Sequence, residues 1–306
     1  MRSSLILALS GLATFAVAEP IPYPPQATSK TAIPADFHPY FGNKKGNFQP
    51  TTATAKANKR RISERDTGGW VQIAADAVWT INDEDGIGAG SDSYTMYWGD
   101  GSAGDGWPTR DQWVSFTEMF NANKVIMFSS CDSFGQADDS GPEVGSIWNA
   151  IEAVAADTGV DHRFILATII QESGGCVRVP TTNYGVRNPG LMQDHDGTGT
   201  CNSDITGEVD NPCPQSTITQ MVTDGTAGTA DGDGLAQCIN ESGLGTDADF
   251  YRAARLYNSG GIDGSGNLQA GIATHCYSSD IANRLTGWVT ADHGCTCDDN
   301  PSSCGL

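Results

Sequence analysis

Glu172 stands near the end of a segment whose apolar residues have helical spacing. The apolar residues of this segment, 162–173, include Phe164, Ile165, Ile169 and Ile170. A helix here places the Glu172 carboxyl on or beside a buried face, at the last turn. Burial disfavours the charged form and the helix C-terminus adds negative potential, so we expect the pKa of Glu172 to be raised. A carboxyl that keeps its proton near neutral pH can act as a general acid, whereas a Glu at a frayed helix end would turn into solvent.

Two downstream segments carry further polar groups that suit a catalytic site. Positions 188–193 read Asn-Pro-Gly-Leu-Met-Gln, and Asp194-His195-Asp196 follow directly. Positions 253–260 read Ala-Ala-Arg-Leu-Tyr-Asn-Ser-Gly, where the last glycine is a helix stop. The run 169–175, Ile-Ile-Gln-Glu-Ser-Gly-Gly, precedes both. Each motif is weak alone, but three in a fixed order are a specific signal.

In order and spacing, these motifs resemble those of goose-type lysozymes and soluble lytic transglycosylases, in the lysozyme-like superfamily. Those families have a helix ending in Glu-Ser, a Gly-Leu-Met-Gln turn about twenty residues later, and an Ala-x-Tyr-Asn-x-Gly helix end downstream. The resemblance covers about 145–290 and leaves 66–140 unexplained. One departure is Leu256, which stands where the family has its second alanine before the tyrosine.

The resemblance implies that Glu172 is the general acid. It also implies that the turn at 190–193 lines a sugar cleft and that the tyrosine and asparagine downstream position the substrate or the acid. His195 lies beside this cleft and is otherwise a loop residue. The residues implied to bind substrate or to hold the cleft are Ser173, Gly190, Leu191, Met192, Gln193, His195, Tyr257 and Asn258.

Asp194 and Asp196 are candidates for a second catalytic carboxylate. Goose-type lysozymes place an aspartate near here that helps to activate water, whereas transglycosylases lack such a base and close an internal anhydro ring. The resemblance therefore leaves hydrolysis and transglycosylation open, with hydrolysis by two carboxylates favoured. The alternative interpretation is that both are ordinary loop acids in an acidic chain.

The first 65 residues read as targeting and processing segments. Residues 1–18 combine Arg2, an apolar run and a small-residue triplet, Ala16-Val17-Ala18, which is typical of a cleaved secretory signal. Residues 19–65 are rich in proline and lack an apolar period, so we expect a propeptide or a disordered linker. This stretch contains Lys59-Arg60-Arg61, a basic processing site. The sequence thus predicts a secreted, extracellular protein with no membrane span.

Charge separates the remainder from this leader. Residues 66–306 contain 34 Asp and Glu but only eight Lys and Arg. Because phosphate backbones bind clustered cations, nucleic acid is excluded as a partner, and so is an anionic membrane. The acidity suits a cationic polymer better than an anionic one. We expect a monomer whose partner is a polysaccharide substrate.

All nine cysteines fall in 66–306, which in an exported chain predicts disulfides. The odd number leaves one thiol free or an irregular pairing within Cys295, Cys297 and Cys304. No Cys-x-x-Cys pair and no calcium loop with its terminal Glu is present. The sequence therefore predicts no metal site and no cofactor.

The predicted fold is mainly α, within the α+β class, with disulfide-stapled loops and at most a small sheet. We expect 141–306 to form a lysozyme-like catalytic domain, and 66–140 a Trp-rich N-terminal extension or small domain. Five of the seven tryptophans lie in 66–113, as packing or, alternatively, as a sugar-stacking platform. Helices are predicted, from apolar periodicity and caps, at 109–120, 144–156, 162–173, 217–222, 248–257, 268–276 and 280–288.

The expected function is that of a secreted glycoside hydrolase that cleaves β-1,4 bonds in an amino-sugar polysaccharide. The motifs favour peptidoglycan, and thus a muramidase. The charge favours chitosan or chitin as an alternative. A lytic transglycosylase on the same fold and a non-catalytic wall-binding protein are the remaining alternatives.

Overall fold

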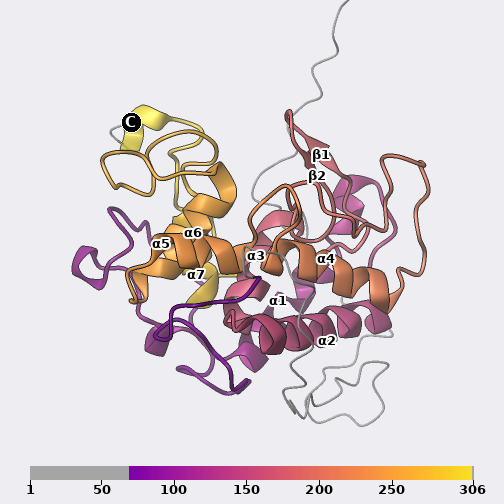
Figure 1. Cartoon of the computed structure of the whole chain (residues 1–306), viewed down its shortest axis with the longest axis horizontal. Helices are drawn as coiled ribbons and strands as arrows, with labels where there is room; N and C mark the ends of the chain where they lie inside the picture. The colour runs from indigo at the N-terminus through magenta and orange to yellow at the C-terminus, as the bar shows by residue number, and fades with distance from the viewer. Residues whose placement is uncertain (1–68, 305–306) are drawn as a thin grey trace, which may run out of the picture.

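The computed structural model describes residues 69–304, in which helices predominate (Figure 1). The α-helices are α1 (Phe116–Met127), α2 (Gly141–Thr158), α3 (His162–Ser173), α4 (Gln215–Ala227), α5 (Leu235–Ser242), α6 (Ala248–Ser259) and α7 (Tyr277–Leu285). Short 3-10 turns lie at Ala103–Asp105, Arg110–Gln112, Cys131–Phe134 and Pro301–Cys304. The only sheet in the described part is an antiparallel pair, β1 (Thr182–Asn183) and β2 (Arg187–Asn188). A mainly helical fold with a small sheet was predicted and is confirmed.

Helix α3 forms the centre of this arrangement. It packs against α1, α2 and α7, and all its residues are buried except Glu172, which is half-buried. Asp161 caps its start by accepting a hydrogen bond from the Arg163 N–H at 3.0 Å. Gly174 ends it in the left-handed conformation, with φ of 63°. The bounds predicted for this helix are therefore confirmed, as are its caps.

The remaining helices flank α3 on two sides. Helices α2 and α4 pack together on one side, and α6 packs against both α5 and α7 on the other (Figure 1). No helix within 69–304 is long and apolar enough to cross a bilayer.

The segment that precedes α2 shares the hydrophobic core of the rest. Trp107, Trp113 and Phe116 are buried in the same cluster as the apolar faces of α2, α3 and α6. The buried Tyr251 hydroxyl of α6 accepts a hydrogen bond from Trp113 Nε1 at 2.8 Å and donates one to the Pro108 carbonyl at 2.6 Å. Residues 69–140 thus wrap around the helices and add to one core. The other three tryptophans of this stretch are exposed: Trp70, Trp79 and Trp98.

Two predicted helices differ from the structure. The prediction that an α-helix starts at Thr109 is wrong, because that residue caps only a short 3-10 turn, and α1 begins seven residues later at Phe116, with Ser115 as its cap. The helix predicted over 268–276 is wrong as well. Its backbone takes positive φ at Gly271 and Ala273, which an α-helix does not allow. Its carbonyls accept hydrogen bonds from Arg255 in place of helical N–H groups. Helix α5 was not predicted.

Four disulfides join the loops: Cys131–Cys176, Cys201–Cys213, Cys276–Cys295 and Cys297–Cys304. The ninth cysteine, Cys238 on α5, is free and buried. The prediction of disulfides with one thiol left over is confirmed. Cys295, Cys297 and Cys304 each take part in one of these four bridges, so the irregular pairing that was the alternative does not occur.

Candidate active site

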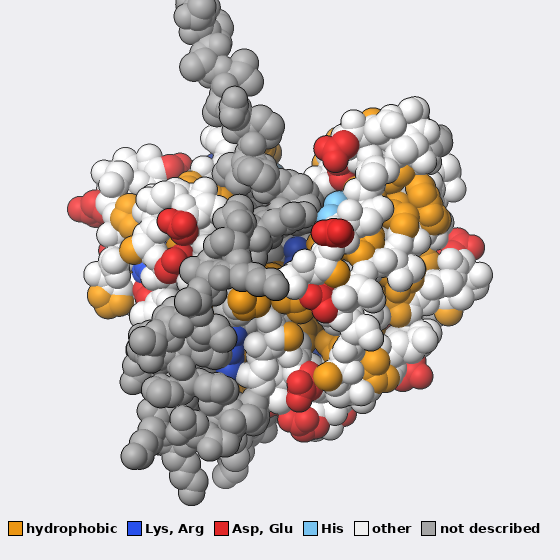
Figure 2. Space-filling model, turned by 180° about the vertical axis from the view of Figure 1, so that it is seen from behind, with side chains coloured by type: hydrophobic (Ala, Val, Ile, Leu, Met, Phe, Trp, Pro, Cys, Tyr) orange, Lys and Arg blue, Asp and Glu red, His pale blue; other side chains and the backbone are white. Residues whose placement is uncertain are grey.

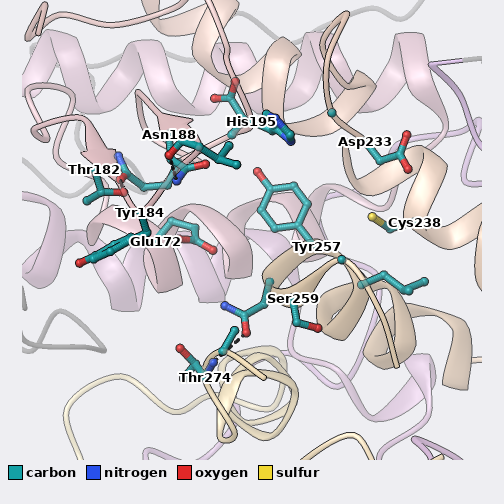
Figure 3. Close-up of a pocket in the computed structure, with 18 of the residues that line it drawn as sticks. Glu172, Thr182, Tyr184, Asn188, His195, Asp233, Cys238, Tyr257, Ser259 and Thr274 are labelled. Carbon is teal, nitrogen blue, oxygen red and sulfur yellow. Dashed lines mark hydrogen bonds between the residues drawn. The ribbon is translucent and has the colours of Figure 1, made fainter. Parts of the chain in front are cut away.

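A cleft of about 930 Å³ opens between the hairpin β1–β2 on one side and α5 and α6 on the other (Figure 3). Glu172 contributes its carboxyl from the last turn of α3, and Tyr257 faces it from α6. Six of the predicted site residues line this cleft: Glu172, Gln193, Asp194, His195, Tyr257 and Asn258. The cleft therefore gathers residues from motifs that are separated by up to 86 positions in the sequence.

The Glu172 carboxyl keeps its proton to near-neutral pH. Burial at the floor of the cleft raises its pKa to about 7, and a hydrogen bond donated by the Tyr277 hydroxyl to Glu172 Oε1 partly opposes this rise. Since the Tyr277 hydroxyl occupies only one oxygen, the other is left to face a ligand. The raised pKa predicted from the helix position is borne out by this environment.

Ser173 has a different position from the one the motif implies for a ligand contact. Its side chain is buried, and its hydroxyl donates to the carbonyls of Ile169 at 3.0 Å and Leu191 at 2.8 Å. The Gly175 N–H in turn donates to the Ser173 hydroxyl at 3.2 Å. Ser173 thus joins the end of α3 to the next motif and lies outside the cleft lining, in accord with the expectation that it holds the cleft.

A tight turn over 190–193 forms one wall of the site. Gly190 has φ of 72°, and a Cβ there would lie 2.6 Å from the Gly199 carbonyl oxygen, so only glycine fits. Leu191 and Met192 are fully buried and do not line the cleft. Gln193 does line it, but its amide is engaged by Thr182 Oγ1 at 2.9 Å and by the Gly190 carbonyl at 3.0 Å. The turn therefore shapes the wall rather than offering free amide groups.

Helix α6 is attached to this turn through Tyr257. Its hydroxyl donates to the Met192 carbonyl at 2.8 Å, so the tyrosine bridges the second and third motifs. Asn258 Oδ1 accepts from the Thr274 N–H at 3.1 Å and fixes the loop that forms the opposite rim. Both residues line the cleft, and both are held by the protein itself before any ligand binds.

Asp194 is buried in the same cleft, and no side chain is hydrogen-bonded to its carboxyl. Only 3% of its surface is exposed, and neither carboxylate oxygen has a hydrogen-bond partner. Burial, then repulsion by the carboxylate of Asp224, raises the pKa of Asp194 to about 8, with a smaller contribution from Glu172. A Cβ at Gly197 would lie 1.7 Å from Asp194 Oδ2, so the glycine makes room for this carboxyl. Uncompensated buried carboxyls are uncommon outside functional sites.

Asp196 does not join this group. It is exposed, has φ of 52°, and pairs loosely with His195 Nε2 at 3.4 Å. It is absent from the cleft lining, whereas the His195 ring is present there. The structure therefore brings only one of the two candidate aspartates to Glu172. The prediction that Asp196 belongs to the site is therefore corrected. The turn after Asp194 directs the Asp196 side chain outward.

The cleft is negatively charged. No Lys or Arg of the described residues lines it, but six acidic side chains do: Glu172, Asp194, Asp231, Asp233, Glu241 and Asp298. Every Lys and Arg within 69–304 is at least partly buried. Figure 2 accordingly shows acidic side chains dispersed over the described surface and only small areas of Lys or Arg. Such a cleft attracts cationic ligands and repels anionic ones.

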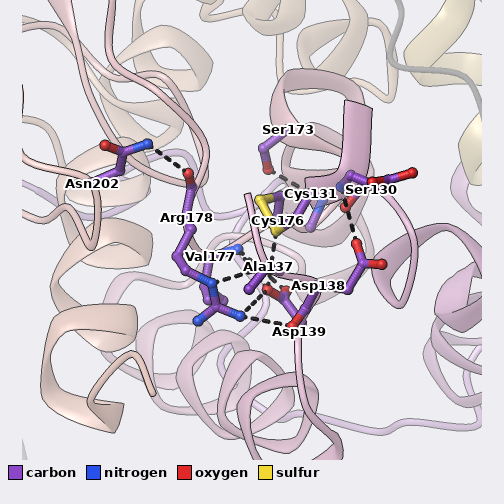
Figure 4. Close-up of a disulfide and its surroundings, with 12 residues drawn as sticks. Ser130, Cys131, Ala137, Asp138, Asp139, Ser173, Cys176, Val177, Arg178 and Asn202 are labelled. Carbon is purple, nitrogen blue, oxygen red and sulfur yellow. Dashed lines mark hydrogen bonds and ion pairs between the residues drawn. A yellow bond between two sulfur atoms is a disulfide. The ribbon is translucent and has the colours of Figure 1, made fainter. Parts of the chain in front are cut away.

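A buried ionic cluster supports the chain just beyond α3 (Figure 4). Arg178 is 1% exposed and contacts both Glu143, at the start of α2, and Asp139. The Val177 N–H also donates to Asp139 Oδ2 at 3.2 Å, next to the Cys131–Cys176 disulfide. Breaking a buried pair from one side leaves an uncompensated charge, at a cost of about 3–5 kcal/mol. The cluster and the disulfide together fix the end of the helix that presents Glu172.

Several residues of the site were not predicted from the sequence. Tyr277 is the most important of them, since it is the hydrogen-bond donor to Glu172 from 105 residues away. Thr182, Tyr184, Asn188 and Thr274 line the cleft as well. Asn188 lies in the second motif and could have been found there, but Tyr277 belongs to no motif and precedes the helix predicted at 280–288.

Comparison with known proteins gives no further support for a family. None of the protein-family models, curated proteins or solved structures that were compared with this chain matches it.

Proposed function

We propose that the protein is a secreted glycoside hydrolase that cleaves β-1,4 bonds in an amino-sugar polysaccharide, with Glu172 as the general acid. The observation that carries the proposal is a carboxyl with a pKa near 7 at the floor of a long cleft, beside a second buried carboxyl. The motif resemblance to goose-type lysozymes supports the same role and a lysozyme-like domain. The leader sequence and four disulfides support secretion.

In the proposed reaction, Glu172 gives its proton to the glycosidic oxygen as the bond from that oxygen to the anomeric carbon breaks. A water molecule attacks the anomeric carbon, and Asp194 accepts a proton from this water. Tyr277 stabilises the Glu172 carboxylate that remains after the transfer. The oxygen atom of water ends on the anomeric carbon, and the leaving sugar keeps the proton from Glu172.

The protonation of Asp194 favours a second chemistry on the same site. Because burial keeps its proton on below about pH 8, Asp194 must ionise before it can serve as a base. Transglycosylation needs no carboxylate base, since a sugar hydroxyl closes the anhydro ring. Mass spectrometry of the products separates the two reactions, because hydrolysis yields reducing ends and transglycosylation yields anhydro ends.

For the substrate, the motifs favour peptidoglycan and the charge favours chitosan. Peptidoglycan is the first candidate because the Gly-Leu-Met-Gln turn is associated with wall-degrading enzymes. Chitosan is the second, because its ammonium groups complement the acidic side chains that line the cleft beyond Glu172 and Asp194, namely Asp231, Asp233, Glu241 and Asp298. Asp231, Asp233 and Glu241 also line this cleft, and Asp233 lies on the side of Tyr257 opposite to Glu172 (Figure 3).

The test compares both polymers with matched variants. Purified protein is incubated with bacterial walls, with chitosan oligomers and with fully acetylated oligomers of equal length. Glu172→Gln should abolish release of products from every substrate that is cleaved, and the exposed Glu118→Gln on α1 should not. If Glu172→Gln retains full activity, or if the parent cleaves none of these substrates, the proposal is wrong and a glycan-binding role replaces it.

Salt and a cleft variant then identify the substrate. If chitosan is the substrate, its cleavage should fall as ionic strength rises, and the double variant Asp233→Asn/Glu241→Gln should raise KM for chitosan oligomers but leave that for acetylated oligomers unchanged. If peptidoglycan is the substrate, the same variant should leave wall digestion unchanged or faster.

A further inference from the structure

A second cluster of ligand-type side chains lies at the opposite end of α3 from Glu172. His162 is the first residue of α3, Glu152 comes from α2, and Asp83 comes from the loop that precedes α1. One nitrogen or oxygen atom from each lies within 4.8 Å of the others. His162 Nε2 and Asp83 Oδ1 are 3.7 Å apart. Three distant chain segments thus converge on one point.

Polar atoms in this cluster are buried and unsatisfied. His162 is 1% exposed and Glu152 is 5% exposed. Both ring nitrogens of His162 and Glu152 Oε1 lack hydrogen-bond partners. Buried polar atoms in native proteins are nearly always satisfied, and an unsatisfied group costs about 1–3 kcal/mol. Because Nδ1 faces Asp161, two of these atoms, His162 Nε2 and Glu152 Oε1, are left for a bound ion to satisfy.

The surroundings aim the imidazole at the two carboxylates. Asp161 Oδ1 lies 3.4 Å from His162 Nδ1 and is itself held by Arg163. The ring of Phe116 packs on the imidazole with a centroid distance of 4.5 Å. A carboxylate behind one ring nitrogen is the usual support for a histidine that binds a metal through the other. Nε2 is therefore the atom presented to Asp83 and Glu152.

We propose that Asp83, Glu152 and His162 bind a divalent transition-metal ion, for which zinc is the probe. One imidazole and two carboxylates are a donor set that zinc accepts, whereas calcium prefers oxygen ligands alone. Two ligands about 2.1 Å from a tetrahedral ion stand about 3.4 Å apart, close to the observed separation of His162 Nε2 and Asp83 Oδ1. Asp83 is only half-buried, so water can complete the coordination from the solvent side.

The proposed ion is structural. It joins the loop at Asp83 to the start of α3 and the middle of α2. The Asp83 carbonyl already accepts a hydrogen bond from the Thr117 N–H of α1 at 3.0 Å. The competing explanation is that Asp83 and Glu152 share a proton, since burial and then the charge of Asp83 raise the pKa of Glu152 to about 8. Sequence spacing could not show this site, because its residues stand 69 and 10 positions apart.

The experiment measures zinc binding by the full secreted protein after removal of metals with a chelator. Titration calorimetry should find one zinc per chain, with a proton released that is detected by repeating the titration in buffers of different ionisation enthalpy. Zinc should raise Tm, and the chelator should reverse this. Asp83→Asn and Glu152→Gln should each weaken zinc binding at least about 10-fold.

The controls distinguish this cluster from other acids of the surface. Glu84→Gln, which removes the exposed carboxyl next to Asp83, should bind zinc like the parent, and so should a variant of the cleft histidine, His195→Gln. The proposal is overturned if zinc does not bind, or if it binds equally well to Asp83→Asn and Glu152→Gln. These readouts do not involve polysaccharide cleavage, so their failure is distinguishable from failure of the proposed function.

Discussion

The two ends of α3 carry buried carboxyls in opposite circumstances. At the C-terminal end, Glu172 and Asp194 line a cleft of about 930 Å³. At the N-terminal end, Glu152 and Asp83 lie close to His162, with one ligand-type atom of each residue within 4.8 Å of the others. Burial raises the pKa of a carboxyl at both ends, so a raised pKa alone does not identify a catalytic group. Access to a ligand of the right size distinguishes them.

Helix α3 is therefore held firmly at both ends while it presents one side chain to the cleft. Side chains from neighbouring segments pack against its first turn. Its last turn is fixed by the Cys131–Cys176 disulfide and by the ion pair of Arg178 with Glu143. Only one side chain of the helix is left partly accessible, and that is Glu172. Rigid support from both ends is what keeps a general acid within hydrogen-bonding reach of a bound substrate.

The largest effect is expected from removing one carboxyl at each end of α3 in turn and comparing the two variants. Glu172→Gln should lower kcat by roughly 100- to 10,000-fold, the range for loss of a general acid, with Tm changed little because the carboxyl is already neutral below pH 7. Glu152→Gln should do the reverse, with kcat retained and the response of Tm to zinc lost. Steady-state rates and thermal melts on both variants measure this. A fall in kcat for Glu152→Gln equal to that for Glu172→Gln would contradict the separation of the two ends.

Asp194 and Asp196 provide the next comparison, within the C-terminal end. Asp194→Asn should lower hydrolysis about 100-fold if it accepts the proton from water, whereas the exposed Asp196→Asn should change the rate less than about 3-fold. Asn also mimics the protonated aspartate, so folding should be preserved. Product analysis is the measurement. Full activity of Asp194→Asn with anhydro products would replace hydrolysis by transglycosylation.

The pH dependence should follow Glu172 and Asp194 together. Because hydrolysis needs Glu172 protonated and Asp194 ionised, kcat/KM should peak between about pH 7 and 8 and decline about 10-fold per pH unit on either side. A pH–rate profile on the parent between pH 4 and 9 tests this. Activity that still rises between pH 8 and 9 would exclude Glu172 as the proton donor.

Tyr277→Phe should move that profile by a smaller amount. The hydroxyl donates to the Glu172 carboxylate and lowers its pKa, so its removal should raise the pKa and carry activity to higher pH. Profiles of parent and variant are compared in the same buffers. Tyr97→Phe, at a tyrosine packed elsewhere against Trp107, is the matched control. A profile displaced to lower pH would contradict the assigned direction.

The smallest effect concerns a buried carboxyl that belongs to neither end. Burial, followed by a hydrogen bond with Asp249, raises the pKa of Asp76 to about 7. The folded chain then holds a proton that the unfolded chain releases above about pH 4, so stability falls as pH rises from about 4 to 7. Asp76→Asn should remove up to about 1.4 kcal/mol of this loss per pH unit without changing kcat. Denaturant unfolding at pH 5 and 7 measures the free energy of unfolding of parent and variant. An equal change with pH in both would show that Asp76 ionises freely.

The sequence was most informative where local signals act alone. Asp161 and Gly174 mark the ends of α3 because capping depends on neighbouring residues, and the apolar spacing placed Glu172 beside the core. Sequence patterns misassigned 268–276, since its conformation is set by Arg255 reaching across from α6 to the carbonyls of Ala270, Ile272 and Thr274. A contact of that kind leaves no periodic trace.

The same limit applies to the candidate site. Asp194 and Asp196 are equivalent in the sequence, and only the turn between them, with its positive φ at Asp196, makes one buried and the other exposed. Tyr277 and the cluster at His162 depend on helices that meet in space, so neither could be inferred from spacing. Motif order predicted which residues gather in the cleft, but not which of their atoms remain free.

The absence of any exposed Lys or Arg side chain within 69–304 has a consequence for resistance to proteases. Proteases of the trypsin type must insert one of these side chains into a deep, negatively charged pocket before they can cut. In this fold five of the eight are buried, namely Lys124, Arg163, Arg178, Arg255 and Arg284, and the other three are partly buried. The folded domain therefore offers such proteases no ready cleavage point, and digestion must wait for unfolding.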